Sequence, residues 1–391
     1  MKINFLKYNS LLVIFYLFYH ILPKIFQILK LDESYCKYFL ILSLFPIIFE
    51  LKNINIKFIK IIFLFTMLVL VNSIFTKATV IEILFHIKDI YFYGISAAIV
   101  GSLKIKKNYL EKYIKIFSYI NIFIYSYIVF YAKNIYYEKM DYMVYGYVML
   151  QSAIFLMFLQ VKNKKILFID FLLIFYSLFM ILLFGNRFAI LIGVFSVLVF
   201  YWYYERKKIK KIILYFLIVL GGVSLYFNLK SILIFMNNLL LKFDYKVYGI
   251  LRLIRSLELK EKGADITSGR IDIYLEAIEV IKNNLFGIGI WGYLSEIKYA
   301  IKGLGYRLGY YPHNIFIEIG MHWGLIGLII FIIFILKAGY RIINMKNSTY
   351  KLFLISLILL NTKLLLSDTY ISYNMFWIFW AVYFNKSYKY G

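Results

Sequence analysis

The sequence predicts an all-α polytopic membrane protein of about twelve transmembrane helices, with one long outer-face loop that contains amphipathic helices. The chain has 391 residues, of which 63% are hydrophobic, and its mean hydropathy is +0.77. A soluble domain of this length could not bury so much apolar surface. Apolar runs recur along the chain, and a run of roughly 20 residues crosses a hydrocarbon core about 30 Å thick.

The basic residues follow the membrane pattern. A formal net charge of +25 would suggest nucleic acid in a soluble protein. Here most Lys and Arg residues lie in short clusters between apolar runs, which is how positive charge marks cytoplasmic loops. We therefore expect a lipid bilayer and no nucleic acid as partner. The single cysteine, Cys36, can form no intramolecular disulfide and no thiolate metal cluster.

The first part of the chain, residues 1–228, is expected to form an N-terminal bundle of about nine spans. Lys2 and Lys7 precede the first apolar run, and no small-residue cleavage site follows it, which indicates an uncleaved first span. The expected spans cover residues 10–29, 38–50, 58–75, 80–101, 113–132, 143–161, 166–185, 187–204 and 211–228.

Residues 317–391 are expected to form the C-terminal transmembrane region, with spans at 317–336, 349–366 and 370–385. When the sides alternate from a cytoplasmic N-terminus, the basic clusters fall inside and both termini are cytoplasmic. These clusters lie at residues 52–60, 104–112, 162–165, 206–211 and 337–346, whereas the opposite loops carry only Lys30, Lys37, Lys77, Lys133, Lys139 and Arg187.

This topology leaves residues 229–316 as one long loop on the outer face. Loops of this length are usually functional or disordered, and the many Ile, Leu, Tyr and Phe residues argue for a folded loop. An amphipathic helix is predicted after Ser268, a plausible N-cap, with Asp272 in its first turn. Its apolar face would contain Ile271, Leu275, Ile278 and Ile281 or Leu285, and would lie on the membrane surface or on the bundle.

Arg270 is a candidate anion-binding residue. It falls in the first turn of that helix, where the helix dipole disfavours a cation by up to about 1 kcal/mol. Together with the free backbone N–H groups of the turn, its guanidinium would form a site for phosphate. The alternative is a surface arginine that pairs with Asp272 or Glu276.

Arg187 lies at the outer junction of two spans that have almost no loop between them. An arginine at such a boundary commonly extends its side chain to the membrane interface. The functional alternative is a second contact to a diphosphate whose lipid tail stays in the bilayer. From the residue alone, the interfacial role is favoured.

His313 follows Pro312 and precedes Asn314, just before a span on the outer face. An imidazole with an ordinary pKa of about 6.5 suits a general base that takes a proton from a hydroxyl nucleophile. A capping or packing role is the alternative. His20, His86 and His322 lie within or near spans and are expected to form hydrogen bonds inside the bundle.

Several motifs are missing from the sequence. It has no D-x-D pair for a metal–diphosphate complex, no H-E-x-x-H, no P-loop and no G-x-S-x-G elbow. We therefore expect no metal and no cofactor. Arginines would have to stabilise a diphosphate leaving group, because a guanidinium donates two hydrogen bonds to phosphate oxygens and stays charged.

The order of motifs in the outer loop resembles the O-antigen ligase and O-antigen polymerase superfamily of bacterial envelope glycosyltransferases. The resemblance covers residues 267–330: S-G-R at 268–270, an amphipathic helix, N-N-L-F-G-I-G at 283–289, H-N at 313–314 and a G-L-I-G-L span at 324–328. One departure is Asn284, which stands where a proline often precedes the glycine-rich segment.

The resemblance implies a metal-independent inverting glycosyltransferase that acts on undecaprenyl-diphosphate-linked glycan at the outer face of the bacterial inner membrane. Arg270 and Arg187 match the family's diphosphate-binding arginines, and His313 matches its catalytic histidine. Arg270 is also expected to take part in catalysis, while Asn314 and Ser268 support the site. The long loop would then be periplasmic or extracellular.

The sequence leaves three functions open. We favour a polymerase that joins lipid-linked repeat units into O-antigen or capsular polysaccharide, with a chain-length regulator and a flippase of the same pathway as expected partners. A ligase that moves finished glycan to lipid A core or a protein shares the donor and the chemistry. A lipid-linked oligosaccharide flippase is the third function, although alternating access generally rests on internal repeats, and we found none.

Overall fold

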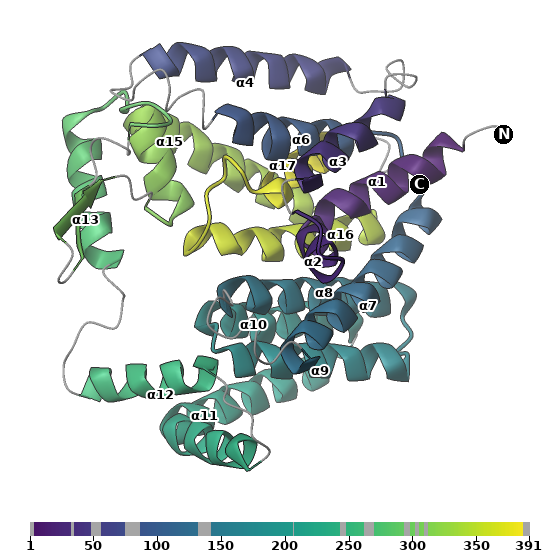
Figure 1. The fold of residues 1–391 in the computed structure, drawn as a ribbon. Helices are drawn as coiled ribbons and strands as arrows, with labels where there is room; N and C mark the ends of the chain where they lie inside the picture. The colour runs from purple at the N-terminus through teal and green to yellow at the C-terminus, as the bar shows by residue number, and fades with distance from the viewer. Residues whose placement is uncertain are drawn as a thin grey trace. The chain divides into compact units, whose positions relative to one another are not determined.

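The chain folds almost entirely into α-helices (Figure 1). The structure is a computed structural model. It describes residues 4–32, 35–47, 56–74, 87–131, 142–205, 207–242, 248–261, 270–292, 298–301, 305–308 and 312–385. Helical structure dominates these ranges, as the sequence predicts, and the one exception within them is a two-stranded hairpin.

Within the described ranges, five helices are long and apolar enough to cross a membrane, and a bent helix pair raises this number to six. The bent pair is α1 (Phe5–Leu17) and α2 (Ile21–Ile28), which meet at 82° inside the predicted first span. These helices support a multi-pass membrane protein. The total of about twelve spans stays a prediction.

Contacts between residues divide the chain into two compact units. Unit 1 contains residues 1–113 and 267–391, and unit 2 contains residues 114–266. The division of the sequence into 1–228, 229–316 and 317–391 follows membrane topology instead, and it also stays a prediction.

Unit 2 is a helical bundle in which α9 packs against α8, and α8 against α10. Asn121 of α7 donates hydrogen bonds to the Val148 carbonyl (3.0 Å) and the Ser152 hydroxyl (2.7 Å) of α8, which satisfies its amide inside the bundle. Its helices are α7 (Lys107–Tyr131), which begins in unit 1, α8 (Tyr142–Asn163), α9 (Phe168–Phe184), α10 (Arg187–Tyr204), α11 (Lys208–Leu241) and α12 (Tyr248–Glu261).

In unit 1, helix α17 packs closely against α6. A Cβ atom on Gly101 of α6 would lie 2.7 Å from Cβ of Ala381, so the glycine allows the two backbones to approach. The Asn385 amide then donates hydrogen bonds to the carbonyls of Ser102 (2.7 Å) and Leu103 (3.0 Å). The remaining elements of this unit are α3 (Tyr35–Leu44), α4 (Ile56–Ile74), η2 (Ile90–Ile95), α6 (Ser96–Gly101), α16 (Ser348–Asn361), the 3-10 turn η3 (Thr362–Leu365) and α17 (Asn374–Phe384).

Regular structure occupies much of the predicted outer loop. Helix α11 continues to Leu241, beyond the predicted span end at 228, and is followed by α12 and α13 (Arg270–Asn283). Strands β1 (Lys298–Ile301) and β2 (Gly305–Leu308) pair antiparallel, a hairpin that the hydropathy pattern did not predict. The loop ends where α15 (Ile315–Ile343) begins.

Candidate functional site

Helix α13 presents Arg270 at its first position and packs against α15. Ile273 and Ala277 of α13 are buried in one apolar cluster with Ile288 and with Met321 of α15. The helix begins at the predicted position, and the predicted N-cap Ser268 lies outside the described residues. Arg270 itself is half-buried.

Only part of the predicted apolar face of α13 packs on the protein. Ile281 lies against the buried cluster, whereas Ile271, Leu275 and Ile278 are 53%, 61% and 40% exposed. The packed face is the one that carries Ile273 and Ala277, and through it α13 lies against α15. A membrane contact of the three exposed side chains stays a prediction.

Asn314 caps helix α15 and fixes His313 at its start. The Asn314 Oδ1 atom accepts hydrogen bonds from the backbone N–H groups of Phe316 (3.0 Å) and Ile317 (3.3 Å). Its Nδ2 atom donates to the Leu365 carbonyl at 3.2 Å, which ties the start of α15 to the end of η3. His313 has a φ of 51°, in the left-handed region that a histidine rarely adopts.

The surroundings of His313 determine its protonation. Burial of the imidazole and the positive charge of Arg270 lower the pKa of His313 from 6.5 to about 4, and the carboxylate of Asp368 acts in the opposite direction. His313 is therefore neutral near pH 7, with a ring nitrogen able to accept a proton. Two of the predicted site residues, Arg270 and His313, thus lie within electrostatic reach of each other.

Tyr274 joins Arg270 and Asn314 in this part of unit 1. It follows Arg270 by one helical turn, and its hydroxyl is buried. Burial raises the pKa of Tyr274, while the charge of Arg270 and the side chain of Asn314 act in the opposite direction. A neutral phenol next to the two predicted residues is a hydrogen-bonding group that the sequence analysis did not single out.

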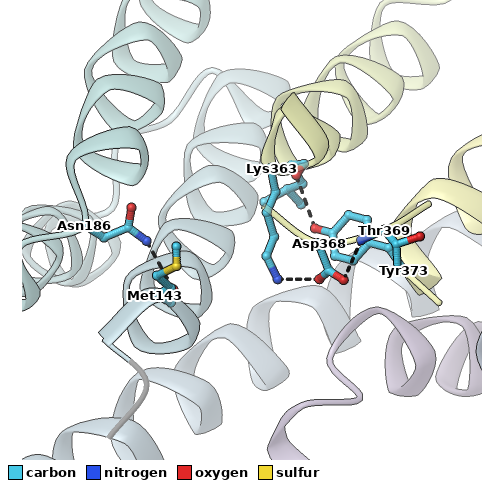
Figure 2. A network of polar contacts seen from close by, with 7 residues as sticks. Met143, Asn186, Lys363, Asp368, Thr369 and Tyr373 are labelled. Atoms are coloured by element: carbon cyan, nitrogen blue, oxygen red, sulfur yellow. Dashed lines mark hydrogen bonds and ion pairs between the residues drawn. The ribbon is translucent and has the colours of Figure 1, made fainter. Parts of the chain in front are cut away.

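The turn after α16 adds an ion pair to the site. Lys363 Nζ lies 2.8 Å from Asp368 Oδ2, and their side chains are only 16% and 29% exposed. Figure 2 shows the two side chains pointing toward one another, with the backbone N–H of Thr369 donating to Asp368 Oδ1 at 3.0 Å. The Lys363 ammonium also lies 5.1 Å from the ring centre of Tyr373.

The sequence analysis missed Lys363 and Asp368, although a signal for them was present. An S-D-T segment interrupts two apolar runs, so its acidic residue had to find a partner near the membrane. Glu318, in the first turn of α15, is a third missed residue: it is fully buried and accepts a hydrogen bond from the Thr369 hydroxyl.

The glycine-rich segment at 285–292 packs into a break in α15. Gly324 has φ 70° and ψ −174°, which no helical residue has, so α15 consists of two helical parts. Backbone hydrogen bonds join the break to the segment, from Leu325 N to Leu285 O (3.0 Å) and from Ile288 N to Met321 O (2.8 Å). The glycines are therefore needed for close backbone approach.

Asn72 of α4 fastens these two segments to each other. Its Nδ2 atom donates to the His322 carbonyl (3.0 Å), and its Oδ1 atom accepts from the N–H of Ile290 (2.7 Å). The carbonyl groups freed by the break in α15 are thus satisfied within the protein, as a membrane helix requires.

His322 forms a hydrogen bond inside the bundle, as predicted. Its Nδ1 atom lies 3.0 Å from the Tyr370 hydroxyl, which also accepts a hydrogen bond from Trp323 Nε1 at 3.1 Å. Among the described residues, no group of three or more His, Cys, Asp or Glu side chains is placed to hold a metal ion.

Arg187 belongs to unit 2, where it is the first residue of α10 and exposed. Gly185 ends α9 with a φ of 68°, and Asn186 caps α10 by accepting from Ala189 N at 3.1 Å. The Asn186 amide donates to the Met143 carbonyl at 3.2 Å (Figure 2), which fixes the corner that carries Arg187. Its approach to Arg270 and His313 stays a prediction.

Comparison with known proteins identifies one family. Residues 172–332 match the sequence model of the O-antigen ligase family. This match covers 161 of the 391 residues and confirms the resemblance to the O-antigen ligase and polymerase superfamily. A search of curated proteins and a search of solved structures gave no match.

Proposed function

We propose, from the relation of residues 172–332 to the O-antigen ligase family, that the chain polymerises undecaprenyl-diphosphate-linked repeat units into O-antigen or capsular polysaccharide. The reaction takes place at the outer face of the bacterial inner membrane. The observation that carries the proposal is the packing of α13 against α15, which brings the cation of Arg270 within electrostatic reach of the neutral base His313.

In the proposed reaction, His313 takes the proton of an acceptor sugar hydroxyl. The oxygen then forms a bond to the anomeric carbon of the donor, and the bond from that carbon to the diphosphate oxygen breaks. The lipid diphosphate leaves with the bonding electron pair. Arg270 and Arg187 stabilise its developing negative charge, so that no metal is required.

Donor binding would also strengthen the base. The positive charge of Arg270 helps to lower the pKa of the free His313 to about 4, which makes the imidazole a weak proton acceptor. A diphosphate bound at Arg270 would offset that charge and raise the pKa of His313. Basicity would then increase only when the donor is in place.

The principal test is His313→Ala. We expect this variant to insert in the membrane in normal amount and to make no long-chain glycan, because the acceptor hydroxyl loses its base; general-base catalysis typically contributes about 10²–10⁴-fold in rate. Gel separation of envelope glycans measures chain length. Normal chain lengths in cells with His313→Ala would remove this residue from the mechanism.

A ligase is the second candidate, and the description of the matched family favours it. Deletion of the gene separates the two. Loss of a polymerase leaves core capped with one repeat unit, whereas loss of a ligase leaves bare core and glycan retained on its lipid carrier.

The flippase hypothesis makes a different prediction for the purified protein. A transferase in detergent lengthens a lipid-linked repeat unit without any energy source, because cleavage of the donor's bond between the anomeric carbon and the diphosphate oxygen drives the reaction. Absence of any such product from a folded protein supplied with donor and acceptor would favour transport.

A further inference from the structure

Two hydrogen bonds join the start of α15, where His313 lies, to η3 and the turn that follows it: Asn314 Nδ2 donates to the Leu365 carbonyl at 3.2 Å, and the Thr369 hydroxyl donates to Glu318. Glu318 lies on α15, one turn beyond Asn314, and its side chain is fully buried. It accepts a hydrogen bond from the hydroxyl of Thr369, which follows Asp368 in the turn after η3. A buried carboxyl group is costly unless it is hydrogen-bonded, so this contact holds the turn against α15.

Two further contacts fix Asp368 in that turn. Its Oδ2 atom pairs with Lys363 at 2.8 Å, and its Oδ1 atom accepts from Thr369 N at 3.0 Å. Asp368 also has a φ of 70°, in the left-handed region that residues other than glycine adopt infrequently. A conformation of that kind persists only where surrounding contacts impose it.

We propose that Glu318 and Thr369 are positioning residues that hold the Asp368 carboxylate beside His313 as its counter-charge. The proposal rests on the proposed function, in which His313 becomes an imidazolium when it takes the acceptor proton. Asp368 stabilises that cation against the nearby Arg270, as a buried carboxylate does for the histidine of a catalytic triad.

Several charged and titratable groups lie on the elements packed around His313. Helix α13 carries Arg270, Asp272, Tyr274, Glu276, Glu279 and Lys282, the part of helix α15 before Gly324 carries Glu318 and His322, and the turn after η3 carries the Lys363–Asp368 pair. Of these charges, Arg270 and Asp368 act on the pKa of His313. Only Asp368 raises the pKa of His313, and burial and Arg270 lower it. Moving the Asp368 carboxylate away would therefore lower the pKa of His313 further.

The test compares Thr369→Val with Thr369→Ser in the full-length purified enzyme. Valine keeps the volume of threonine and removes the hydroxyl, whereas serine keeps the hydroxyl. We expect Thr369→Val to lower kcat by about tenfold, the order of one lost charge-assisted contact, with KM for the donor unchanged. The acid limb of its pH profile should move to lower pH, and Thr369→Ser should behave as the parent enzyme does.

Asp368→Asn provides the second variant. It should move the acid limb in the same direction, and the double variant Thr369→Val/Asp368→Asn should show no further shift, because both changes remove one interaction. An unmoved acid limb in folded Thr369→Val and Asp368→Asn enzymes would overturn the positioning role.

His313→Ala separates this inference from the proposed function. If His313→Ala is inactive while the Thr369 and Asp368 variants keep the parental profile, the positioning role alone is wrong. If His313→Ala stays active, the proposed base itself is wrong.

Discussion

At the scale of single residues, the pKa of His313 is the property that links structure to chemistry. Burial and Arg270 hold it at about 4 in the free protein. Since the unprotonated imidazole is the active form, activity should be retained above that pKa and lost as the pH falls through it. The dependence of kcat/KM on pH reports the free enzyme, so its acid limb should lie near pH 4.

The profile of kcat should differ, because it reports the complex with donor. A bound diphosphate offsets the charge of Arg270 and raises the pKa of His313, so the acid limb of kcat is expected at higher pH than that of kcat/KM. Steady-state rates from about pH 3.5 to about pH 8 measure both limbs, because this range includes the pKa of about 4 in the free protein and the ordinary histidine value of about 6.5. Coincident limbs would show that donor binding leaves the base unchanged.

Arg270→Gln tests whether the charge of Arg270 lowers the pKa of His313. The variant should lose about 10²–10³-fold in kcat, because one group that stabilises the leaving diphosphate is gone. The residual activity should have its acid limb at higher pH than the parent, since a positive charge that lowered the pKa of His313 has been removed. Arg270→Lys is the control, because it keeps the charge and should keep the limb near its original position.

At the scale of elements, the break in α15 depends on one glycine. A Cβ atom on Gly324 would lie 1.9 Å from the Leu285 carbonyl oxygen, and its backbone conformation is one that only glycine adopts readily. Gly324→Ala should destabilise the folded protein by roughly 3 kcal/mol from strain and overlap together.

Gly339→Ala is the matched control on the same helix. A Cβ atom there meets nothing within 4 Å, and alanine favours helix over glycine by about 1 kcal/mol. Thermal unfolding of the two variants in detergent measures the difference. Equal unfolding temperatures would contradict the close backbone packing at Gly324.

Local sequence signals predicted a helix with Arg270 in its first turn, and α13 begins at Arg270. The tenth span was expected from residue 317, and α15 begins at Ile315 after an Asn314 cap that the sequence analysis did not identify. These features depend on residues a few positions apart. Asp368 could not be found in this way, because it acts on a histidine 55 positions earlier and only tertiary folding brings the two together.

The apolar runs of the sequence predicted the helical fold class, but they did not predict the break in α15. Apolar runs identify membrane helices, but a glycine within an apolar run gives no sign that the backbone turns there. Gly324 is such a residue, and the partner that requires it, the segment at 285–292, lies far earlier in the sequence. Periodicity also did not determine what the apolar residues of α13 contact: Leu275, one of them, is 61% exposed and does not pack on the protein.

At the scale of the whole molecule, the alternation of basic clusters makes a topology prediction. Residue Glu279 on the exposed side of α13 should face outward, and the exposed Lys165 should face the cytoplasm. In a Cys36→Ser background, an impermeant thiol reagent applied to intact cells should therefore label Glu279→Cys. Lys165→Cys is the control and should be labelled only after the cells are broken. The reverse pattern would place the candidate base on the cytoplasmic side and exclude the proposed reaction.

The break at Gly324 divides α15 into a part that can anchor the protein in the membrane and a part that can bury polar side chains inside the protein. The part from 325 to 343 is about 28 Å long at 1.5 Å per residue, close to the thickness of a hydrocarbon core, so it suffices as an anchor. The nine residues before the break are thereby released from contact with lipid, and Glu318 and His322 are fully enclosed there. The effect of polar substitutions on stability should accordingly differ between the two parts of the helix. Before Gly324 it should depend on the neighbouring protein side chains, and after Gly324 on contact with lipid acyl chains.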